Sequence, residues 1–378
     1  MPSAVDLRVV GVSIPDVRDW REPVAQGKWS QFFGALARRV DLIDVVQPEI
    51  AGVDHYLNLA RRFHPSKDRW KAAAGFNRSI ARKRSEAVQR ALQRHAGEYD
   101  LIVQLQTLCE PGLGRSEAPY AIYTDSTLAL TRRHYLPRAQ LSAKEASWWM
   151  AYEAEVCRAA TSVFTFSEFA RASVIEDYGC SPERVAAVGA GANQLSESVA
   201  EKEDTTPRAL FVGIDFTCKG GHVLLQAWPA VRERVPDAEL IVVGPAGRPK
   251  GPLPEGVSWM GWVDRARLAR LYESASVFVM PSLFEAWGHS LIEAMGYGLP
   301  CIGTNCYAMP EIIDDGVTGR LVARGEPEPL AEALAELLGD PAKAAAMGRT
   351  AHARVLEERR WSDVVDRVLA HLGVLAGR

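Results

Sequence analysis

Two glutamates, Glu285 and Glu293, stand eight residues apart in the part of the chain that is richest in ligand-binding groups. The segment runs from Pro281 to Pro300, PSLFEAWGHSLIEAMGYGLP, and its pattern predicts a loop followed by a helix. Glu285 falls in the loop and Glu293 about one turn into the helix, so both carboxylates can point into the same ligand-binding cleft. The alternative is that Glu293 only complements the helix dipole and that Glu285 is a solvated loop residue.

The start of this predicted helix supplies a second kind of ligand-binding group, backbone N–H donors. Ser290 is expected to be the helix N-cap, and Gly288 lets the backbone approach a ligand closely. The N–H groups of Trp287, Gly288 and His289 then lie at the positive end of the helix, which suits oxygen-rich or anionic ligands.

A lysine stands beside two glycines earlier in the chain, in the segment ALFVGIDFTCKGGHVLLQAW. Ala209–Val212 is predicted to be a strand, and Lys219, Gly220 and Gly221 open the helix that follows it. A lysine charge next to the N–H donors of a helix start is typical of a diphosphate site, although no P-loop string is present. The alternative is a surface lysine in front of an ordinary helix cap.

The elements that must position these groups alternate between strand and helix along the whole chain, which is typical of parallel sheets covered by helices. Twelve strands are expected, each a short apolar run: Leu7–Val12, Val40–Val46, Tyr99–Gln106, Tyr120–Tyr123, Ser162–Phe166, Arg184–Val188, Ala209–Val212, Ala238–Val243, Val257–Met260, Ser276–Met280, Pro300–Ile302 and Gly319–Val322. The helices expected between them include Trp29–Arg39, Ser79–His95, Lys144–Ala160, Glu168–Tyr178 and His222–Val235.

A polar, acidic segment at Gln194–Pro207 is interpreted as a linker between domains. The sequence therefore predicts an α/β protein with two doubly wound, Rossmann-like domains, residues 1–195 and 208–355. Residues 356–378 are expected to form a terminal helix that packs back toward the first domain. Since open α/β sheets bind ligands outside the carboxyl ends of their strands, we expect two facing domains with the ligand in the cleft between them.

The composition excludes several other classes of protein. A chain of 378 residues that is 47% hydrophobic and 24% charged is globular rather than disordered, and a formal charge of −3 argues against a general polyanion binder. No apolar run reaches about 18 residues, six scattered cysteines are too few for a disulfide framework, and the first residues do not resemble a secretory signal. We therefore expect a cytoplasmic protein with reduced thiols.

Taken together, the motifs resemble the retaining glycosyltransferases of family 4, which have the GT-B fold of two facing Rossmann-like domains. The resemblance rests on the Glu-x7-Glu string FEAWGHSLIE, the preceding Pro281-Ser282, the strand-loop string FVG…KGG and the downstream string PEIIDDGVTGRLV. These motifs keep the family's order and spacing between Phe211 and Val322. The first half matches more weakly, through Gly27 and Phe166-Ser167.

The resemblance implies a role for each matching residue. Glu293 would hold the ribose hydroxyls of the donor, Glu285 would position the ring of the transferred sugar, and Lys219 would contact the donor diphosphate. The stretch Trp287–Ser290 would donate N–H groups to sugar hydroxyls and phosphate, and Gly27 would approach the donor phosphates and the acceptor. The implied reaction is retaining transfer of a hexose-like sugar from a nucleotide diphosphate donor to an acceptor hydroxyl.

Two positions depart from the family's pattern. Ile214 stands where the family usually has an arginine, five residues before Lys219, that gives the diphosphate a second cation. Asp125 takes the place of a common histidine near the C6 side of the sugar, where an aspartate could still hydrogen-bond a hydroxyl. These two residues suggest one alternative function, a transferase-like protein of the same fold with altered chemistry. The other alternative is a sugar-nucleotide epimerase, an enzyme class that shares the fold.

No metal ion or other cofactor is expected. The chain lacks the Asp-x-Asp string of metal-dependent glycosyltransferases, and Lys219 together with a helix start would supply positive charge instead. Cys301 and Cys306 are interpreted as small apolar residues rather than metal ligands.

A basic segment, Arg61–Arg94, stands apart from these motifs. It carries eleven Lys and Arg against Asp68 and Glu86, a net +9, so the rest of the chain carries −3 − 9 = −12. One interpretation is contact with an anionic membrane, on its inner face, or with a phosphorylated acceptor; the other is an ordinary solvated face. The expected partners are otherwise a nucleotide sugar and a saccharide, lipid or small-molecule acceptor, without nucleic acid.

Overall fold

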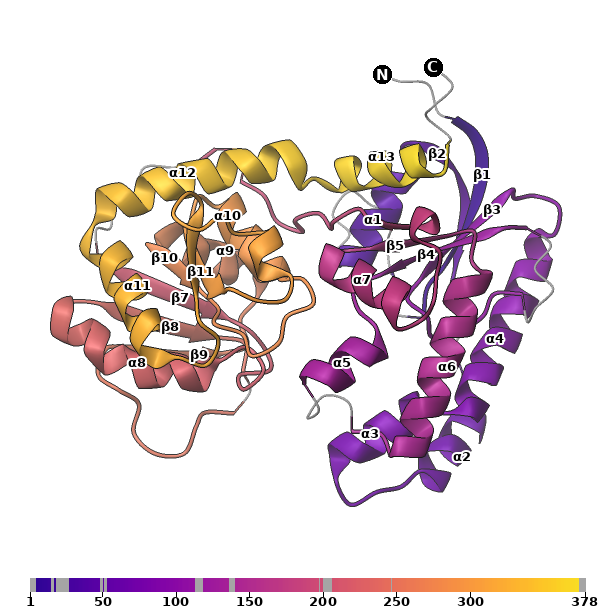
Figure 1. Cartoon of the computed structure of the whole chain (residues 1–378), viewed down its shortest axis with the longest axis horizontal. Helices are drawn as coiled ribbons and strands as arrows, with labels where there is room; N and C mark the ends of the chain where they lie inside the picture. Colours follow the sequence, from indigo (N-terminus) through magenta and orange to yellow (C-terminus); the bar gives the residue numbers. More distant parts are fainter. Residues whose placement is uncertain are drawn as a thin grey trace. The chain divides into compact units, whose positions relative to one another are not determined.

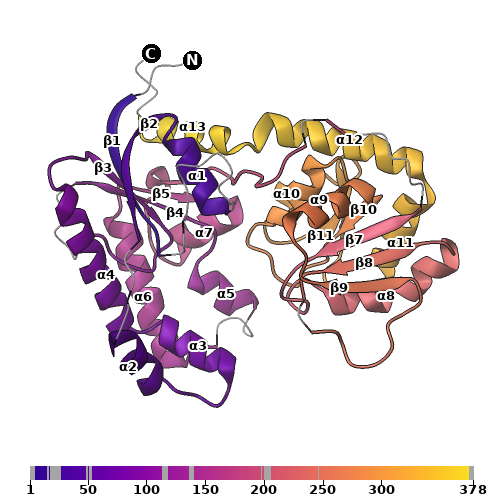
Figure 2. The ribbon, with the colours of Figure 1, turned by 180° about the vertical axis from the view of Figure 1, so that it is seen from behind.

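The computed structural model describes residues 5–14, 17, 27–47, 50, 53–112, 118–135, 140–196, 198–199, 206–245 and 247–373. The chain divides into two units: unit 1 comprises residues 1–190 and 361–378, and unit 2 comprises residues 191–360. Each unit contains one six-stranded sheet with helices on both of its faces (Figures 1 and 2).

The sheet of unit 1 is parallel throughout, with the strand order β2-β1-β3-β4-β5-β6. Its strands are β1 (Val5–Val12), β2 (Val40–Val46), β3 (Leu101–Leu105), β4 (Tyr120–Thr124), β5 (Ser162–Thr165) and β6 (Val185–Ala187). β3, β4 and β5 are buried along their whole length, because helices cover both faces of a parallel sheet. This double burial explains why the strands read as continuous apolar runs rather than as an alternating pattern.

Eight helices of the described chain belong to unit 1: α1 (Lys28–Leu36), α2 (Val53–Arg61), α3 (Lys67–Gly75), α4 (Arg78–Leu92), α5 (Leu128–His134), α6 (Ala143–Ala159), α7 (Glu168–Glu176) and α13 (Trp361–His371). The longest are α4 and α6, and both contribute to the core beneath the sheet. The short helices α2 and α3 lie at the end of α4 and α6 that is away from the strands, in both views (Figures 1 and 2).

The sheet of unit 2 is also parallel and has the order β12-β11-β10-β7-β8-β9. Its strands are β7 (Arg208–Val212), β8 (Glu239–Val243), β9 (Val257–Gly261), β10 (Val277–Val279), β11 (Cys301–Thr304) and β12 (Gly319–Val322). The order changes direction between β7 and β10, and ligands bind at such a point in open α/β sheets. The loops that follow β7 and β10 therefore meet at the carboxyl edge.

The helices of unit 2 are α8 (Gly221–Arg234), α9 (Arg265–Ser274), α10 (His289–Gly296), α11 (Pro327–Gly339) and α12 (Pro341–Glu358). α8 and α11 pack against each other and against the sheet, around the fully buried Trp228. The indole N–H of Trp228 donates to the carbonyl of Glu255 at 3.0 Å, so this large apolar group is buried without leaving its donor unsatisfied.

After α12 the chain returns to unit 1 for α13, which packs against α1. Trp361 is 6% exposed and lies edge to face with Phe32, with ring centroids 6.2 Å apart. Arg39 pairs with Asp366 at 2.7 Å, and the Arg367 guanidinium donates to the carbonyl of Val188 at 2.8 Å. The last helix is thus part of the packing of unit 1.

All twelve predicted strands are present, with ends that differ by at most two residues. The sequence did not predict the helices α2, α3 and α5, because they are short and two of them are highly charged. Such helices are stabilised by tertiary contacts rather than by a local apolar pattern. Residues 356–358 complete α12 instead of starting a terminal helix. Residues 197 and 200–205 of the expected linker lie outside the described residues.

We predict that Trp361→Ala lowers the free energy of unfolding of unit 1 by about 3–5 kcal/mol, because the substitution leaves a cavity between α13 and α1. The matched control is Trp262→Ala, since Trp262 is 77% exposed and its loss should change stability by less than about 0.5 kcal/mol. Denaturant unfolding followed by far-UV circular dichroism measures both; equal stability of the two variants would contradict the packing assigned to α13.

Candidate functional site

The loop after β7 and the loop after β10 are fastened to each other at the carboxyl edge of the unit 2 sheet. The Leu283 N–H donates to the carbonyl of Cys218 at 2.8 Å, and the Cys218 thiol donates to the carbonyl of Phe284 at 3.4 Å. Gly220 has a φ of +72°, and a Cβ added to it would lie 1.8 Å from the carbonyl oxygen of Pro281. Only glycine permits this approach of the two backbones.

This contact brings Lys219 and Glu285 together. Their side chains are 20% and 10% exposed, and the Lys219 ammonium forms an ion pair with the Glu285 carboxylate. The other Glu285 oxygen accepts from the Trp287 N–H at 3.4 Å, and the Lys219 stem passes so close to Gly213 that a Cβ there would lie 2.8 Å from Lys219 Cγ. The two predicted residues are therefore one charged pair, and neither is a solvated surface side chain.

The glycines that follow Lys219 are explained by packing. Besides the Gly220 contact, a Cβ on Gly221 would lie 2.0 Å from the ring of Phe216. The Asp215 carboxylate accepts from the Cys218 N–H at 3.0 Å, which closes the turn between β7 and α8. The sequence interpretation, a lysine beside the N–H donors of a helix start, did not include this packing requirement.

The start of α10 differs from the expectation. Its N-cap is Gly288, with a φ of +129°, and no side chain caps the helix. Ser290 lies inside the first turn, with its hydroxyl 3.3 Å from the sulfur of Met280, so the prediction that Ser290 is the N-cap was wrong. The reason is conformational: the chain enters α10 at Gly288 through a φ that only glycine adopts without strain, two residues too early for Ser290 to cap the helix.

The residues beside Gly288 are held in place by unit 2 itself. Trp287 is 3% exposed and has the Arg359 guanidinium 5.4 Å from its ring centroid. Its N–H is directed at Glu285, so one of the three N–H groups predicted to meet a ligand already has a carboxylate acceptor. His289 opens the helix and is partly buried.

Glu293 lies one turn into α10, as predicted, and forms a polar cluster of its own. The Asn193 amide donates to one carboxylate oxygen at 3.1 Å and the Tyr272 hydroxyl to the other at 3.5 Å. Burial raises the pKa of the Glu293 carboxyl, against the opposing effect of the Asn193 hydrogen bond. Burial also raises the pKa of Tyr272 far above its usual value, so its hydroxyl remains a donor.

The residues predicted in unit 1 are Gly27 and Asp125. Gly27 is the N-cap of α1, with an extended backbone, and Asp125 follows β4. Asp125 forms an ion pair with Lys28 at 2.7 Å, and the Lys28 ammonium lies 4.4 Å from the Trp29 ring centroid and 5.2 Å from that of Phe166. Lys28 was missed by the sequence analysis, although it directly follows Gly27.

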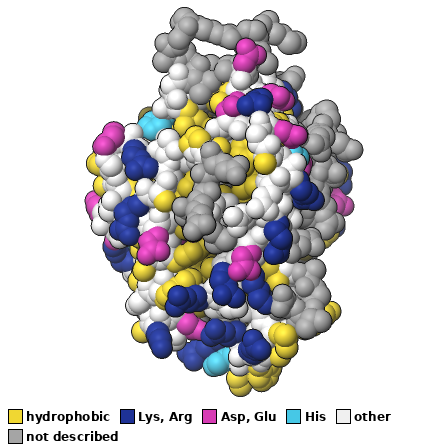
Figure 3. Space-filling model, turned by 90° about the vertical axis from the view of Figure 1, so that its right-hand side faces the viewer, with side chains coloured by type: hydrophobic (Ala, Val, Ile, Leu, Met, Phe, Trp, Pro, Cys, Tyr) yellow, Lys and Arg dark blue, Asp and Glu magenta, His cyan; other side chains and the backbone are white. Residues whose placement is uncertain are grey.

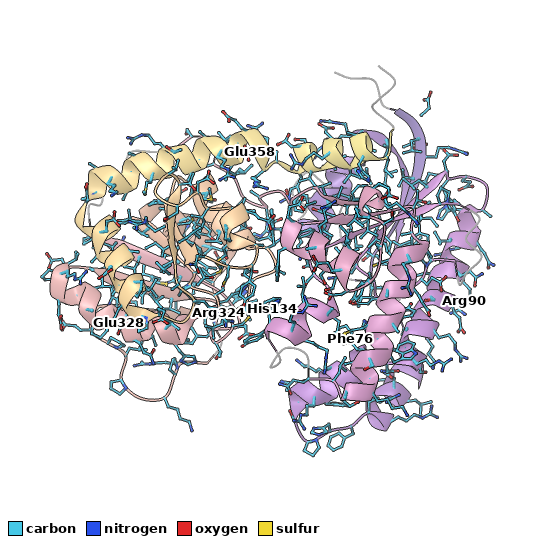
Figure 4. All side chains as sticks on the ribbon, viewed as in Figure 1. Phe76, Arg90, His134, Arg324, Glu328 and Glu358 are labelled. Carbon is cyan, nitrogen blue, oxygen red and sulfur yellow. The ribbon has the colours of Figure 1, made fainter. Side chains whose placement is uncertain are left out.

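Arg324, which follows β12 and is labelled in Figure 4, was also missed. Its guanidinium donates to the carbonyl of Leu283 at 3.2 Å and to the Tyr307 hydroxyl at 2.6 Å. Tyr307 has a φ of +61°, which is uncommon for a residue other than glycine. Arg324 thus brings a cation to the loop that carries Glu285, whereas Ile214, at the position expected to hold an arginine, is an 81% exposed apolar residue.

The described residues contain neither a cluster of metal-ligating side chains nor a helix that could span a membrane. No three His, Cys, Asp or Glu side chains gather there as metal ligands would, and the six cysteines are free thiols. No helix in the described part of the chain is long and apolar enough to cross a bilayer.

The second unit matches a family model. The model described as glycosyl transferases group 1 matches residues 206–340. A mannosyltransferase of Mycolicibacterium hassiacum, MMP alpha-(1->4)-mannosyltransferase, is 26% identical over 304 residues, which are 74% of this chain and 72% of the relative. D-inositol 3-phosphate glycosyltransferase of Corynebacterium urealyticum is 29% identical over 61% of this chain and 60% of its own. Phosphatidyl-myo-inositol mannosyltransferase of Mycobacterium leprae is 36% identical over 39% of this chain and 42% of its own length.

Solved structures share the fold of the whole chain. Sucrose-phosphate synthase from Thermosynechococcus elongatus superposes with a TM-score of 0.72 at 19% identity, covering 98% of this chain and all of that one. HepE of Anabaena, whose structure was determined with UDP and glucose, gives a TM-score of 0.65 at 16% identity over 98% of this chain and all of that one. The fold is therefore GT-B, with two six-stranded parallel sheets.

Proposed function

Because residues 206–340 match the family model of the group 1 glycosyl transferases, we propose that the chain is a retaining hexosyltransferase. The donor is a nucleotide diphosphate sugar and the acceptor group is a hydroxyl. A hexose is supported by the relatives, two of which are named mannosyltransferases. The reaction breaks the bond between the sugar C1 and the diphosphate oxygen and forms a bond from C1 to the acceptor oxygen on the same face.

The observation that carries this proposal is the buried pair of Lys219 and Glu285 at the carboxyl edge of the unit 2 sheet. A lysine ammonium has three donors, and its ion pair with Glu285 uses one direction, so two remain for oxygens of a diphosphate. The pair has no net charge, which keeps it stable in the absence of donor. Lys219 is therefore held at the opening of α8 in the orientation that a diphosphate needs.

Departure of the diphosphate is the step that Lys219 assists. As the bond to C1 breaks, the electron pair moves onto the diphosphate oxygen, and a positioned ammonium stabilises the charge that develops there. Arg324 supplies a second cation on the neighbouring loop, in a role that Ile214 cannot perform. The acceptor hydroxyl gives its proton to the departing phosphate oxygen, so that no protein nucleophile is required.

Glu285 and Glu293 act on different parts of the donor. Glu293 is bound by Asn193 and Tyr272, which orient its carboxylate to accept from the ribose hydroxyls. Glu285 lies on the loop before α10 and positions the sugar while it holds Lys219. Asp125 of unit 1 is paired with Lys28, and its role of hydrogen-bonding a sugar hydroxyl stays a prediction from the sequence.

The experiment that tests the proposal is turnover of a panel of nucleotide sugars with NMR of the anomeric product. Release of nucleoside diphosphate together with a product of retained configuration supports the transferase. We expect the same turnover in excess EDTA. An inverted product, or conversion of the donor to its C2 epimer, would overturn it and favour the epimerase.

We predict that Lys219→Met lowers kcat by roughly 100-fold or more and weakens nucleotide diphosphate binding much less, because the stabilisation grows as the leaving charge develops. Methionine keeps the stem that packs on Gly213 and removes only the charge. Steady-state kinetics and calorimetric titration of the nucleotide measure the two effects. Lys250→Met, at an exposed lysine, is the matched control; an unchanged kcat with a raised KM in Lys219→Met would make Lys219 a docking residue only.

We predict that Glu293→Ala raises the donor KM by roughly 10- to 150-fold, the equivalent of a lost charged hydrogen bond of about 1.5–3 kcal/mol. Since burial raises the pKa of Glu293, its carboxylate is charged above that pKa and takes up a proton at a higher pH than an ordinary glutamate. The donor KM of the native enzyme should therefore rise as the pH falls through the raised pKa.

The pH profile separates Glu293 from other groups. Glu293→Gln cannot titrate, so its donor KM should be elevated and lose this pH dependence. Glu328→Ala, at an exposed glutamate labelled in Figure 4, should behave like the native chain. A native-like donor KM in Glu293→Ala would exclude the ribose contact.

A further inference from the structure

The end of unit 1 formed by α2 and α3 carries an exposed surface that the proposed reaction does not use. We call it the basic tip and define it by six residues on these helices and the turn between them: Tyr56, Leu57, Phe63, Lys67, Arg69 and Lys71. Figure 3 shows dark blue side chains gathered over the lower half of this face, with hydrophobic side chains at its lower edge.

Side-chain hydrogen bonds hold the helices of the basic tip together. The Trp70 indole donates to the carbonyl of Leu59 at 2.8 Å, which joins α3 to α2. The Asn58 amide donates to the carbonyl of Ala74 at 2.8 Å, and the Asn77 amide donates to Asn58 at 3.1 Å, which joins both helices to the start of α4. Hydrogen bonds within unit 1 therefore fix the backbone of the tip. They also fix the positions from which its outward side chains project.

Three large apolar side chains of the tip face solvent. Tyr56 is 71% exposed, Phe63 is 70% exposed and Leu57 is 42% exposed. Tyr56 and Leu57 lie on α2, and Phe63 lies in the turn that follows it. Phe63 lies edge to face with Trp70 at 5.8 Å, so its ring is supported from behind while its outer side stays open. Water is a poor environment for such a cluster.

The cations of the tip have no acidic partners among the described residues. Lys67, Arg69 and Lys71 are exposed and form no ion pair there. Elsewhere in the basic segment Arg62 pairs with Glu145 and Arg82 with Glu86, so pairing does occur where a carboxylate is near. Within the described side chains, the tip thus presents positive charge that no ion pair compensates, in a protein whose net charge is −3.

We propose that the basic tip docks the protein on the surface of an anionic lipid bilayer. Aromatic and apolar side chains enter the interface between head groups and acyl chains, and the cations beside them attract anionic head groups. A soluble phosphorylated ligand would satisfy the cations but would leave Tyr56 and Phe63 in water, so the membrane accounts for both observations. This contact is independent of the donor chemistry in unit 2 and is reversible, because the charges act only near the surface.

The test is sedimentation of the full chain with vesicles of phosphatidylcholine alone and with about 30% phosphatidylglycerol. We expect binding that requires the anionic lipid and falls when salt is raised from about 0.05 M to about 0.5 M. No binding to anionic vesicles at low salt, or equal binding to neutral vesicles, would overturn the proposal. Retention on a heparin column without vesicle binding would assign the cations to a soluble polyanion and also overturn it.

Matched variants assign the binding to the tip. A cation near an anionic surface strengthens binding about fivefold, so Lys67→Ala with Arg69→Ala and Lys71→Ala should weaken partitioning at least about tenfold. The control removes three other exposed cations, Arg90, Arg94 and Arg270; Figure 4 labels Arg90 on the part of α4 away from the tip. Equal loss in both triple variants would reject the tip as the docking surface.

The apolar part is tested separately. Tyr56→Ser with Phe63→Ser should weaken binding to anionic vesicles. The binding that remains should be more sensitive to salt, because only electrostatic attraction is left. Circular dichroism spectra and melting temperatures like those of the native chain establish that the variants are folded. Unchanged partitioning of a folded double variant would contradict insertion of these side chains.

Discussion

The approach of Gly220 to the carbonyl of Pro281 is the constraint on which the candidate site depends. It places the loops after β7 and β10 against each other, and hydrogen bonds from Leu283 and Cys218 hold them there. Any side chain at position 220 would both clash with this backbone and strain a φ of +72°. Lys219 and Glu285 are 66 residues apart in the sequence, so their ion pair can form only because the two loops dock against each other.

Lys219 and Arg324 each have hydrogen-bond partners within unit 2. Lys219 is compensated by Glu285, and Arg324 donates to a backbone carbonyl and a tyrosine hydroxyl. A buried ammonium or carboxylate without a partner is costly, so the pairing stabilises both ions. In the proposed reaction, a diphosphate that binds at Lys219 would add negative charge close to two cations that are already positioned, so little reorganisation would be required. A preorganised arrangement of this kind is what electrostatic stabilisation of a leaving group requires.

The two ends of unit 1 differ in their physical character. At the carboxyl edge of its sheet, Asp125 and Lys28 compensate each other beside the rings of Trp29 and Phe166. At the basic tip, three cations share two short helices with exposed aromatic rings, and none of them has such compensation among the side chains that the structure describes. The first arrangement is stable by itself in water. The second becomes favourable when a surface of opposite charge and low polarity covers it.

The sequence by itself determined the twelve strands, the α/β class and the position of Glu293 in its helix. These depend on the period of apolar residues along short segments, which is a local property. The tertiary structure decided the rest. It stabilised α2 and α3 through contacts of Asn58 and Trp70, and it made Gly288 rather than Ser290 the start of α10. It also made partners of Lys219 and Glu285 and brought Arg324 to their loops, because a contact between distant segments depends on the order of the strands in the sheet, which no local pattern contains.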